Sequence, residues 1–156
     1  PWRRGAWLLA LVALALGAPG ASGQLVFGAH VARAPDLFGG ADGFGLRAGL
    51  ELGPVGVTAV GDWYGVDCPP DVGECHYRSG TLLGTVEVPA PLIRPYLLAG
   101  LGIRDLAPGP GASVRTTVAG FGLRVGLGPA GVFTEVAGEL PRQGPAQLVL
   151  RVGARF

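Results

Sequence analysis

From residue 24 onward, apolar side chains recur at every second position in segments of about ten residues, and Gly- or Pro-rich breaks separate these segments. A period of two places successive side chains on opposite faces of an extended strand, so each segment predicts a β-strand. The 29 Gly and 14 Pro residues exclude a helical bundle, because Gly costs a helix interior about 1 kcal/mol and Pro about 3 kcal/mol relative to Ala. A charged fraction of only 15% argues against disorder.

Eight predicted strands share this alternation. They are expected at Leu25–Ala34, Gly43–Leu52, Val55–Tyr64, Tyr77–Val88, Ile93–Leu106, Val114–Leu127, Val132–Leu140 and Gln147–Phe156. Short connectors (53–54, 89–91 and 128–131) alternate with longer ones (35–42, 65–76, 107–113 and 141–146). This rhythm is typical of an all-β, antiparallel up-and-down transmembrane barrel with short periplasmic turns, longer extracellular loops and both chain ends in the periplasm.

The two faces of each predicted strand differ: one is continuously apolar, and the other combines Gly with isolated charges. In the last strand, Leu148, Leu150 and Val152 share one face, whereas Arg151 and Arg155 share the other. A soluble sheet would give water a face rich in Lys, Glu, Thr and Ser, and the second face is too poor in charge for that. We therefore expect the apolar face to meet lipid and the Gly and charged residues to fill a narrow lumen.

This rule places six basic and five acidic side chains in the lumen. They are Arg47, Arg94, Arg104, Arg124, Arg151 and Arg155, with Glu51, Asp62, Glu87, Glu135 and Glu139. Buried charges must be paired, and the two signs nearly cancel. Clustered carboxylates also occur at catalytic sites, but we expect a structural ion-pair core. The sequence does not determine which groups pair.

Strand length agrees with a membrane crossing. Ten residues at about 3.3 Å each, tilted by about 45°, rise roughly 23 Å. The apolar band of outer-membrane barrels is about 25 Å tall.

Residues 1–23 have the order of a cleavable secretory signal peptide: Arg3 and Arg4, an apolar run over 6–16, and small residues over 17–23. The run of about 11 residues is shorter than the roughly 20 that a transmembrane helix needs. We expect cleavage after Gly23, with Ala21 as the alternative, which leaves residues 24–156 as one barrel domain. An uncleaved anchor is the other interpretation. The chain has no further basic block, so nucleic-acid binding is not expected.

Two motifs carry a family resemblance. Residues 94–102 (RPYLLAGLG) are similar to the R-P-Y-x-x-x-G-x-G strand of small outer-membrane barrels of the OmpX-like and opacity-like group. The chain ends in Phe156, preceded at alternate positions by Leu148, Leu150 and Val152, and this ending resembles the C-terminal signal that the barrel-assembly machinery recognises. Two departures are Ala154, where the family often has an aromatic residue, and the short loops, which weaken any transfer of adhesin or invasin activity.

This resemblance covers residues 24–156 and has several implications. It implies a location in the outer membrane of a Gram-negative-type bacterium. It also implies contact with the barrel-assembly machinery and periplasmic chaperones during biogenesis, and a monomer surrounded by outer-membrane lipid. It names no surface partner.

Cys68 and Cys75 lie in the second longer loop. In an exported protein, two nearby cysteines predict a disulfide, which would contribute about 2–3 kcal/mol less any strain. Metal ligation with Asp67 and His76, or two free thiols, are the alternatives. Because the spacing matches no standard zinc pattern, we expect no metal. We also expect no cofactor, because the Gly-Phe-Gly segments 43–45 and 120–122 do not form a G-x-G-x-x-G phosphate loop followed by a helix.

Aromatic residues lie at several strand ends. Trp63, Tyr64 and Tyr77 lie beside a longer loop and are candidates for an aromatic girdle at the outer interface. Tyr96 is a candidate for the periplasmic side, although the alternation points it into the lumen.

Taken together, these patterns predict a non-enzymatic integral outer-membrane barrel with a largely plugged lumen, serving envelope structure or surface interaction through its loops. One alternative is a narrow pore for ions or small solutes. Another is a secreted lipocalin-like barrel that binds a small apolar ligand, which requires an apolar lumen and a charged exterior. A third is a lipid-modifying enzyme: lipid A deacylases resemble this chain in size and topology and use a His–Ser pair. No local motif of theirs surrounds His30 or His76, and we expect no catalytic residue.

Overall fold

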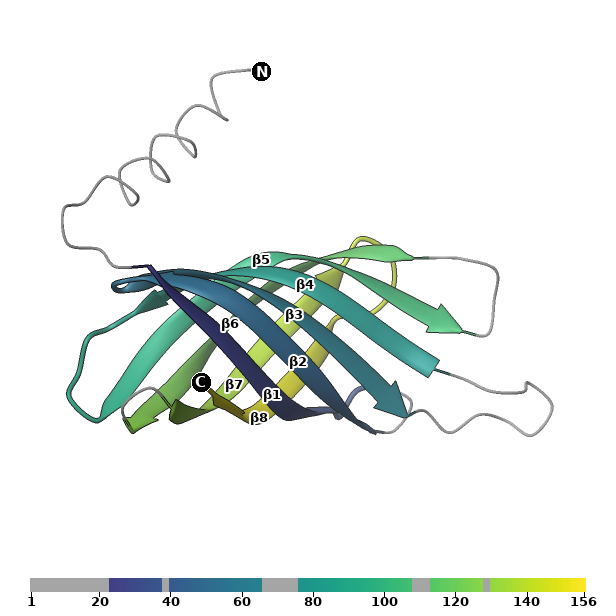
Figure 1. Ribbon diagram of the computed structural model, residues 1–156. Helices are drawn as coiled ribbons and strands as arrows, with labels where there is room; N and C mark the ends of the chain where they lie inside the picture. Colours follow the sequence, from purple (N-terminus) through teal and green to yellow (C-terminus); the bar gives the residue numbers. More distant parts are fainter. Residues whose placement is uncertain (1–22, 38–39, 66–75, 108–112, 128–129) are drawn as a thin grey trace, which may run out of the picture.

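A computed structural model of the chain describes residues 23–37, 40–65, 76–107, 113–127 and 130–156. Eight antiparallel strands follow one another around a closed barrel (Figure 1). They are β1 (Gln24–Ala34), β2 (Ala41–Leu52), β3 (Val55–Gly65), β4 (His76–Glu87), β5 (Ile93–Ala107), β6 (Val114–Leu127), β7 (Ala130–Pro141) and β8 (Gln147–Arg155). The predicted fold is confirmed, and no strand end differs from its predicted position by more than two residues.

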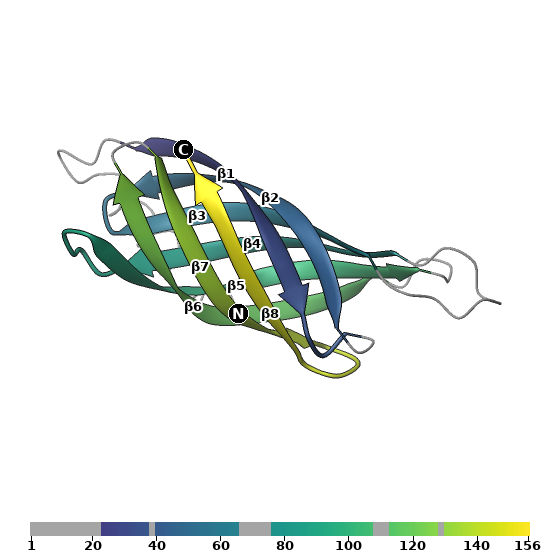
Figure 2. The same cartoon turned by 90° about the horizontal axis from the view of Figure 1, so that it is seen from below.

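The barrel closes by antiparallel pairing of β1 with β8, which lie side by side in Figure 2. At the extreme C-terminus, the Phe156 N–H donates to the Phe27 carbonyl oxygen at 2.9 Å, and the Phe27 N–H donates to the Phe156 carbonyl oxygen at 2.9 Å. Closure leaves no unpaired strand edge, which is a requirement for a sheet that crosses a lipid bilayer.

Short turns and longer loops define the two ends of the barrel. The turn end carries connectors 53–54, 88–92 and 128–129, and the loop end carries 35–40, 66–75, 108–113 and 142–146. Gly53 has a φ of 63° at the first central position of its two-residue connector. That left-handed conformation is the one that primed hairpin turns require, and Gly adopts it without steric cost.

The outward face is an apolar belt that surrounds all eight strands. Exposed members from each strand include Leu25, Phe27, Leu46, Val57, Leu82, Leu97, Phe121, Val132 and Leu150. In the described strands, the outward-facing charged residues lie near the loop end: Arg33, Asp42, Arg78, Asp105 and Arg115. Among the described residues, no helix has the length and apolarity needed to cross a membrane.

The inward face is polar and charged over much of its area, with two apolar clusters. One cluster lies near the loop end and contains Ala32, Ala34, Leu37, Ala41, Tyr64, Tyr77 and Val149. The other lines β3 to β7 and contains Val60, Leu83, Tyr96, Leu98, Val118 and Ala137. A lipocalin-like barrel needs a charged exterior and an apolar lumen, so that alternative is wrong.

The aromatic residues correct one prediction. Trp63 faces outward and stacks on Phe44, with ring centroids 5.6 Å apart, which fits an interfacial girdle. Tyr64 and Tyr77 instead point inward and are 4% and 3% exposed, so the prediction that they belong to the girdle is wrong. Tyr64 is two residues from the inward-facing Asp62, and the strand period places both on the same face.

Lumen glycines make room for bulky neighbours, and Gly122 provides a test. A Cβ atom at Gly122 would collide with the Tyr96 ring and lie 2.7 Å from the Thr134 carbonyl oxygen. We expect Gly122→Ala to destabilise the barrel by about 1–3 kcal/mol, the usual cost of overpacking, measured by urea unfolding of the refolded protein. The matched control is Gly138→Ala, whose Cβ would lie 3.8 Å from the Ala119 carbonyl oxygen. Equal effects of both variants would contradict a crowded lumen.

Candidate functional site

The candidate functional site is the lumen, where side chains from different strands meet. Glycines on the inward face create the space for these contacts. At Gly45, for example, a Cβ would collide with the His30 imidazole and lie 2.6 Å from Asp62 Oδ1. The alternation of Gly with charged residues is therefore the local sequence feature that lets large polar side chains share a narrow interior.

The lumen contacts form layers along the barrel axis. In the first layer, at the turn end, acidic residues of β2 and β4 bind arginines of β6 and β8. Arg124 donates to Glu51 at 2.8 Å and to Glu87 at 2.6 Å. Arg155 donates two hydrogen bonds to Glu51, at 2.6 and 2.7 Å. Arg94 reaches Glu87 at 3.4 Å and is the most exposed of the group, with 44% of its side chain accessible. Because β2 and β6 lie on opposite sides of an eight-stranded barrel, the Arg124–Glu51 pair spans the lumen.

The second layer is built on a bidentate ion pair. Arg47 of β2 donates two hydrogen bonds of 2.8 Å to the carboxylate of Glu135 on β7. The Tyr96 hydroxyl of β5 donates to the same carboxylate at 2.7 Å, which settles the orientation of Tyr96 as inward. The Arg47 guanidinium also lies 3.7 Å from the centroid of the Phe133 ring. Paired N–H donors and a stacked ring hold the guanidinium in one orientation.

The third layer surrounds Arg151 of β8, whose side chain is 0% exposed. Arg151 donates to Asp62 at 2.8 and 3.4 Å and to Glu139 at 3.4 Å. His30 Nε2 lies 2.6 Å from Asp62 Oδ1, and Ser79 donates to Asp62 Oδ2 at 3.1 Å. Asp62 therefore joins β3 to β1, β4 and β8 through side-chain contacts alone.

The His30, Asp62 and Ser79 group does not have the geometry of a catalytic triad. In a triad the histidine contacts the serine hydroxyl and the acid orients the histidine. Here His30 and Ser79 both bind the Asp62 carboxylate, one on each oxygen. All three residues are buried inside the barrel. The arrangement satisfies the buried carboxylate rather than activating a nucleophile.

At the loop end, Arg104 of β5 binds neutral groups. It donates to the Gln147 side-chain oxygen at 2.6 Å and to the Pro145 carbonyl oxygen at 3.4 Å. The Tyr77 hydroxyl also donates to Gln147, at 2.9 Å. Within the described residues, Arg104 has no carboxylate oxygen within 4.0 Å. Among the eleven charged residues expected in the lumen, Arg104 is the one whose partners within the described residues are polar but uncharged.

The structure brings most of the eleven residues expected in the lumen into direct contact. Sequence reasoning missed four polar residues that complete the layers, and it left the orientation of Tyr96 open. The four are His30, Tyr77, Ser79 and Gln147. For His30, the strand period could have predicted the inward orientation, because His30 lies four residues from the inward-facing Val26 on the same strand. The proposed assembly-signal residues face outward: Leu148, Leu150 and Val152 on β8, and Phe156 directly after it. Cys68 and Cys75, with the predicted disulfide, lie outside the described residues, as do residues 1–22 of the predicted signal peptide 1–23.

Comparison with known proteins identifies the fold and no more than the fold. No protein-family profile matches the chain, and no curated protein sequence is significantly similar to it. The N-terminal β-barrel domain of Pseudomonas aeruginosa OprF superposes with a TM-score of 0.65 at 20% identity, covering 88% of this chain and 100% of that domain. Neisserial surface protein A (NspA) gives 0.62 at 18% identity, covering 88% and 99%.

The outer membrane enzyme PagL also matches, with a TM-score of 0.48 and 13% identity over 85% of this chain and 99% of that one. A score that low supports no argument about activity. The closed sheet and the apolar belt define a membrane-spanning β-barrel. Its fold is that of the small eight-stranded outer-membrane barrels.

Proposed function

We propose that the protein is a non-enzymatic outer-membrane barrel whose lumen is largely plugged by paired charges, and that it serves envelope structure or surface interaction through its four loops. One observation carries this proposal: the lumen ion pairs connect strands that are not neighbours. Arg124–Glu51 joins β6 to β2, Arg151–Asp62 joins β8 to β3, and Arg47–Glu135 joins β2 to β7. Each pair therefore crosses the space through which a solute would have to pass.

The energetics support a closed lumen. An arginine that leaves its carboxylate inside the lumen exposes two unpaired charges to a low-dielectric interior, which is unfavourable. A continuous path would require the ion pairs of several layers to separate at once. Envelope structure and contacts made by the loops do not require a path.

A narrow pore is the second candidate, and a specific observation favours it. Three buried arginine nitrogens have no hydrogen-bond partner within the described part of the protein: Arg47 Nε, Arg124 Nε and Arg151 Nη1. Buried N–H groups of this kind usually bind water. A file of such waters between the ion pairs would provide a route for protons or small ions.

Planar-bilayer recording separates the two candidates. We expect no stepwise conductance from the refolded wild-type barrel, because three layers of ion pairs obstruct the lumen. Insertion is verified on the same preparation by gel mobility, in which an unheated folded barrel migrates faster than the boiled chain. A wide porin in the same bilayer is the positive control. Reproducible wild-type steps would overturn the plugged lumen and establish the pore.

The last strand supports a further proposal about biogenesis. Leu148, Leu150, Val152 and Phe156 present one apolar, outward-facing edge, and Phe156 forms the final backbone pair with β1. We propose that the barrel-assembly machinery binds this segment first. At closure, β1 then takes the place of the machinery as the partner of the segment. Periplasmic chaperones would protect the apolar belt until then, and the inserted barrel would remain a monomer in outer-membrane lipid.

A further inference from the structure

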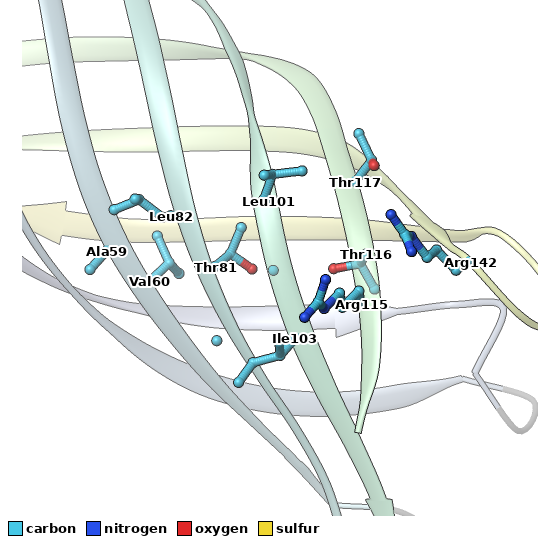
Figure 3. A pocket seen from close by; sticks show the side chains of 12 residues that line it. Ala59, Val60, Thr81, Leu82, Leu101, Ile103, Arg115, Thr116, Thr117 and Arg142 are labelled. Atoms are coloured by element: carbon cyan, nitrogen blue, oxygen red, sulfur yellow. The ribbon is translucent and has the colours of Figure 1, made fainter. Parts of the chain in front are cut away.

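The outward face has a groove of about 620 Å³ between β3 and β6 (Figure 3). Its exposed lining changes in character along its length. Apolar side chains from β3, β4 and β5 form one part, and two arginines form the part at the loop end. The exposed lining residues are Ala59, Leu82, Leu101, Ile103, Arg115, Thr117 and Arg142.

The strand register explains why a hollow exists there. Four outward-facing residues form one row across β3 to β6. Gly61 pairs with Gly80, Gly80 pairs with Ile103, and Ile103 pairs with Arg115. Two of these four positions have no side chain, so the surface is low between their neighbours. A Cβ at Gly80 would approach only Ile103 Cγ1, at 3.9 Å, which shows that open space lies above this glycine.

The next outward row toward the turn end is strongly apolar. Leu82 pairs with Leu101, and Leu101 pairs with Thr117. Leu82 is 58% exposed and Leu101 is 69% exposed. These side chains belong to the lipid-facing belt, so a hydrocarbon chain is the natural occupant of this part of the groove.

Arg115 and Arg142 form the charged part of the groove. The backbone N–H of Arg142 donates to the backbone carbonyl oxygen of Arg115 at 3.0 Å, and this hydrogen bond holds the two residues next to each other. Within the described residues, neither guanidinium has a carboxylate oxygen within 4.0 Å. The nearest outward-facing acid along β5 is Asp105, which lies directly across from Arg78 in the β4–β5 register. Figure 3 shows Arg115 and Arg142 on the same side of the pocket as Thr117.

We propose that this groove binds a phosphorylated lipid of the outer leaflet. Its phosphate lies on Arg115 and Arg142, and an acyl chain lies along Leu82 and Leu101. Guanidinium groups bind phosphate through paired, charge-assisted hydrogen bonds. The longer loops of outer-membrane barrels are extracellular, which places these arginines at the level of the outer-leaflet headgroups. A free phosphate ion would leave the adjoining apolar lining unused, so the lipid is the occupant that matches both parts.

The test is native mass spectrometry of the refolded protein in micelles, titrated with bisphosphorylated lipid A. We expect saturable binding by the wild type and at least tenfold weaker binding by Arg115→Gln/Arg142→Gln. A second variant, Gly80→Leu, fills the hollow without removing charge and is expected to weaken binding to a similar extent. The matched control is Arg33→Gln, a rim arginine on β1 that pairs with Asp42 at 3.5 Å and is expected to bind like the wild type. Retention of the fast unheated gel band verifies folding of each variant.

Several outcomes would overturn the proposal. Equal binding of dephosphorylated lipid A would show that the two arginines do not recognise a lipid phosphate. Full competition by inorganic phosphate would show that the site binds free phosphate rather than a lipid. Equal losses in Arg33→Gln and in the double variant would indicate general attraction to a basic rim. None of these results depends on whether the lumen conducts, so the plugged-lumen proposal is tested separately.

Discussion

Replacement of Arg151 by Met is expected to destabilise the barrel by about 3–5 kcal/mol, because it removes the cation from a fully buried cluster of carboxylates. Arg151 binds Asp62 and Glu139, and all three side chains are at most 1% exposed. Met occupies a similar volume and adds no charge, so the carboxylates lose their counter-ion with little change in packing. The measurement is the urea-unfolding midpoint of the protein refolded into phospholipid vesicles.

Two companions to this variant identify the cause. Arg33→Met removes an exposed arginine whose ion pair with Asp42 is open to solvent, and it is expected to cost less than about 1 kcal/mol. The double variant Arg151→Met/Asp62→Asn removes the unbalanced charge as well, and it is expected to recover at least about 1 kcal/mol of the loss. A double variant less stable than Arg151→Met would mean that packing, and not charge, explains the cost.

Replacement of Leu46 by Arg is expected to cost about 2–4 kcal/mol, the penalty for an arginine that faces lipid near the middle of the bilayer. Leu46 is 56% exposed and is paired with Ala29 and Gly61 in the central part of β1, β2 and β3. In a water-soluble protein, the same change at so exposed a site would alter stability by no more than about 0.5 kcal/mol. The same unfolding measurement in vesicles distinguishes the two cases.

The control for depth is Val132→Arg. Val132 also faces outward and is 52% exposed, but it is the third residue of β7 and lies close to the turn end. The expected cost falls to about 0–1 kcal/mol near a membrane interface. Similar costs for Leu46→Arg and Val132→Arg would contradict the assignment of a lipid-facing belt with a defined centre.

Much of the barrel was predictable because the period of two residues both identifies the strands and separates their inward-facing from their outward-facing side chains. Alternation in β8 separates Leu148 and Leu150 from Arg151, and the same separation recurs in every strand. Gly alternating with charge on one face is incompatible with a water-facing sheet, so inside and outside were assigned correctly. The orientation of Tyr64 and Tyr77 was also present in this pattern. The wrong prediction gave weight to their position beside a loop instead of to their phase with Asp62 and Ser79.

The amino-acid sequence by itself determined the strands, the closed barrel, and which side chains face lipid, because these depend on a local period of two residues. Only the tertiary structure decided the partners within the lumen and the composition of the outward groove. Arg104 binds Gln147 while Arg151 binds two carboxylates, and Gly80 lies beside Ile103 and near Arg115. Those contacts depend on the register of each strand against the next and on which strands face each other across the barrel. Strand register and contacts across the lumen relate residues that are far apart in the chain, and a local period carries no information about them.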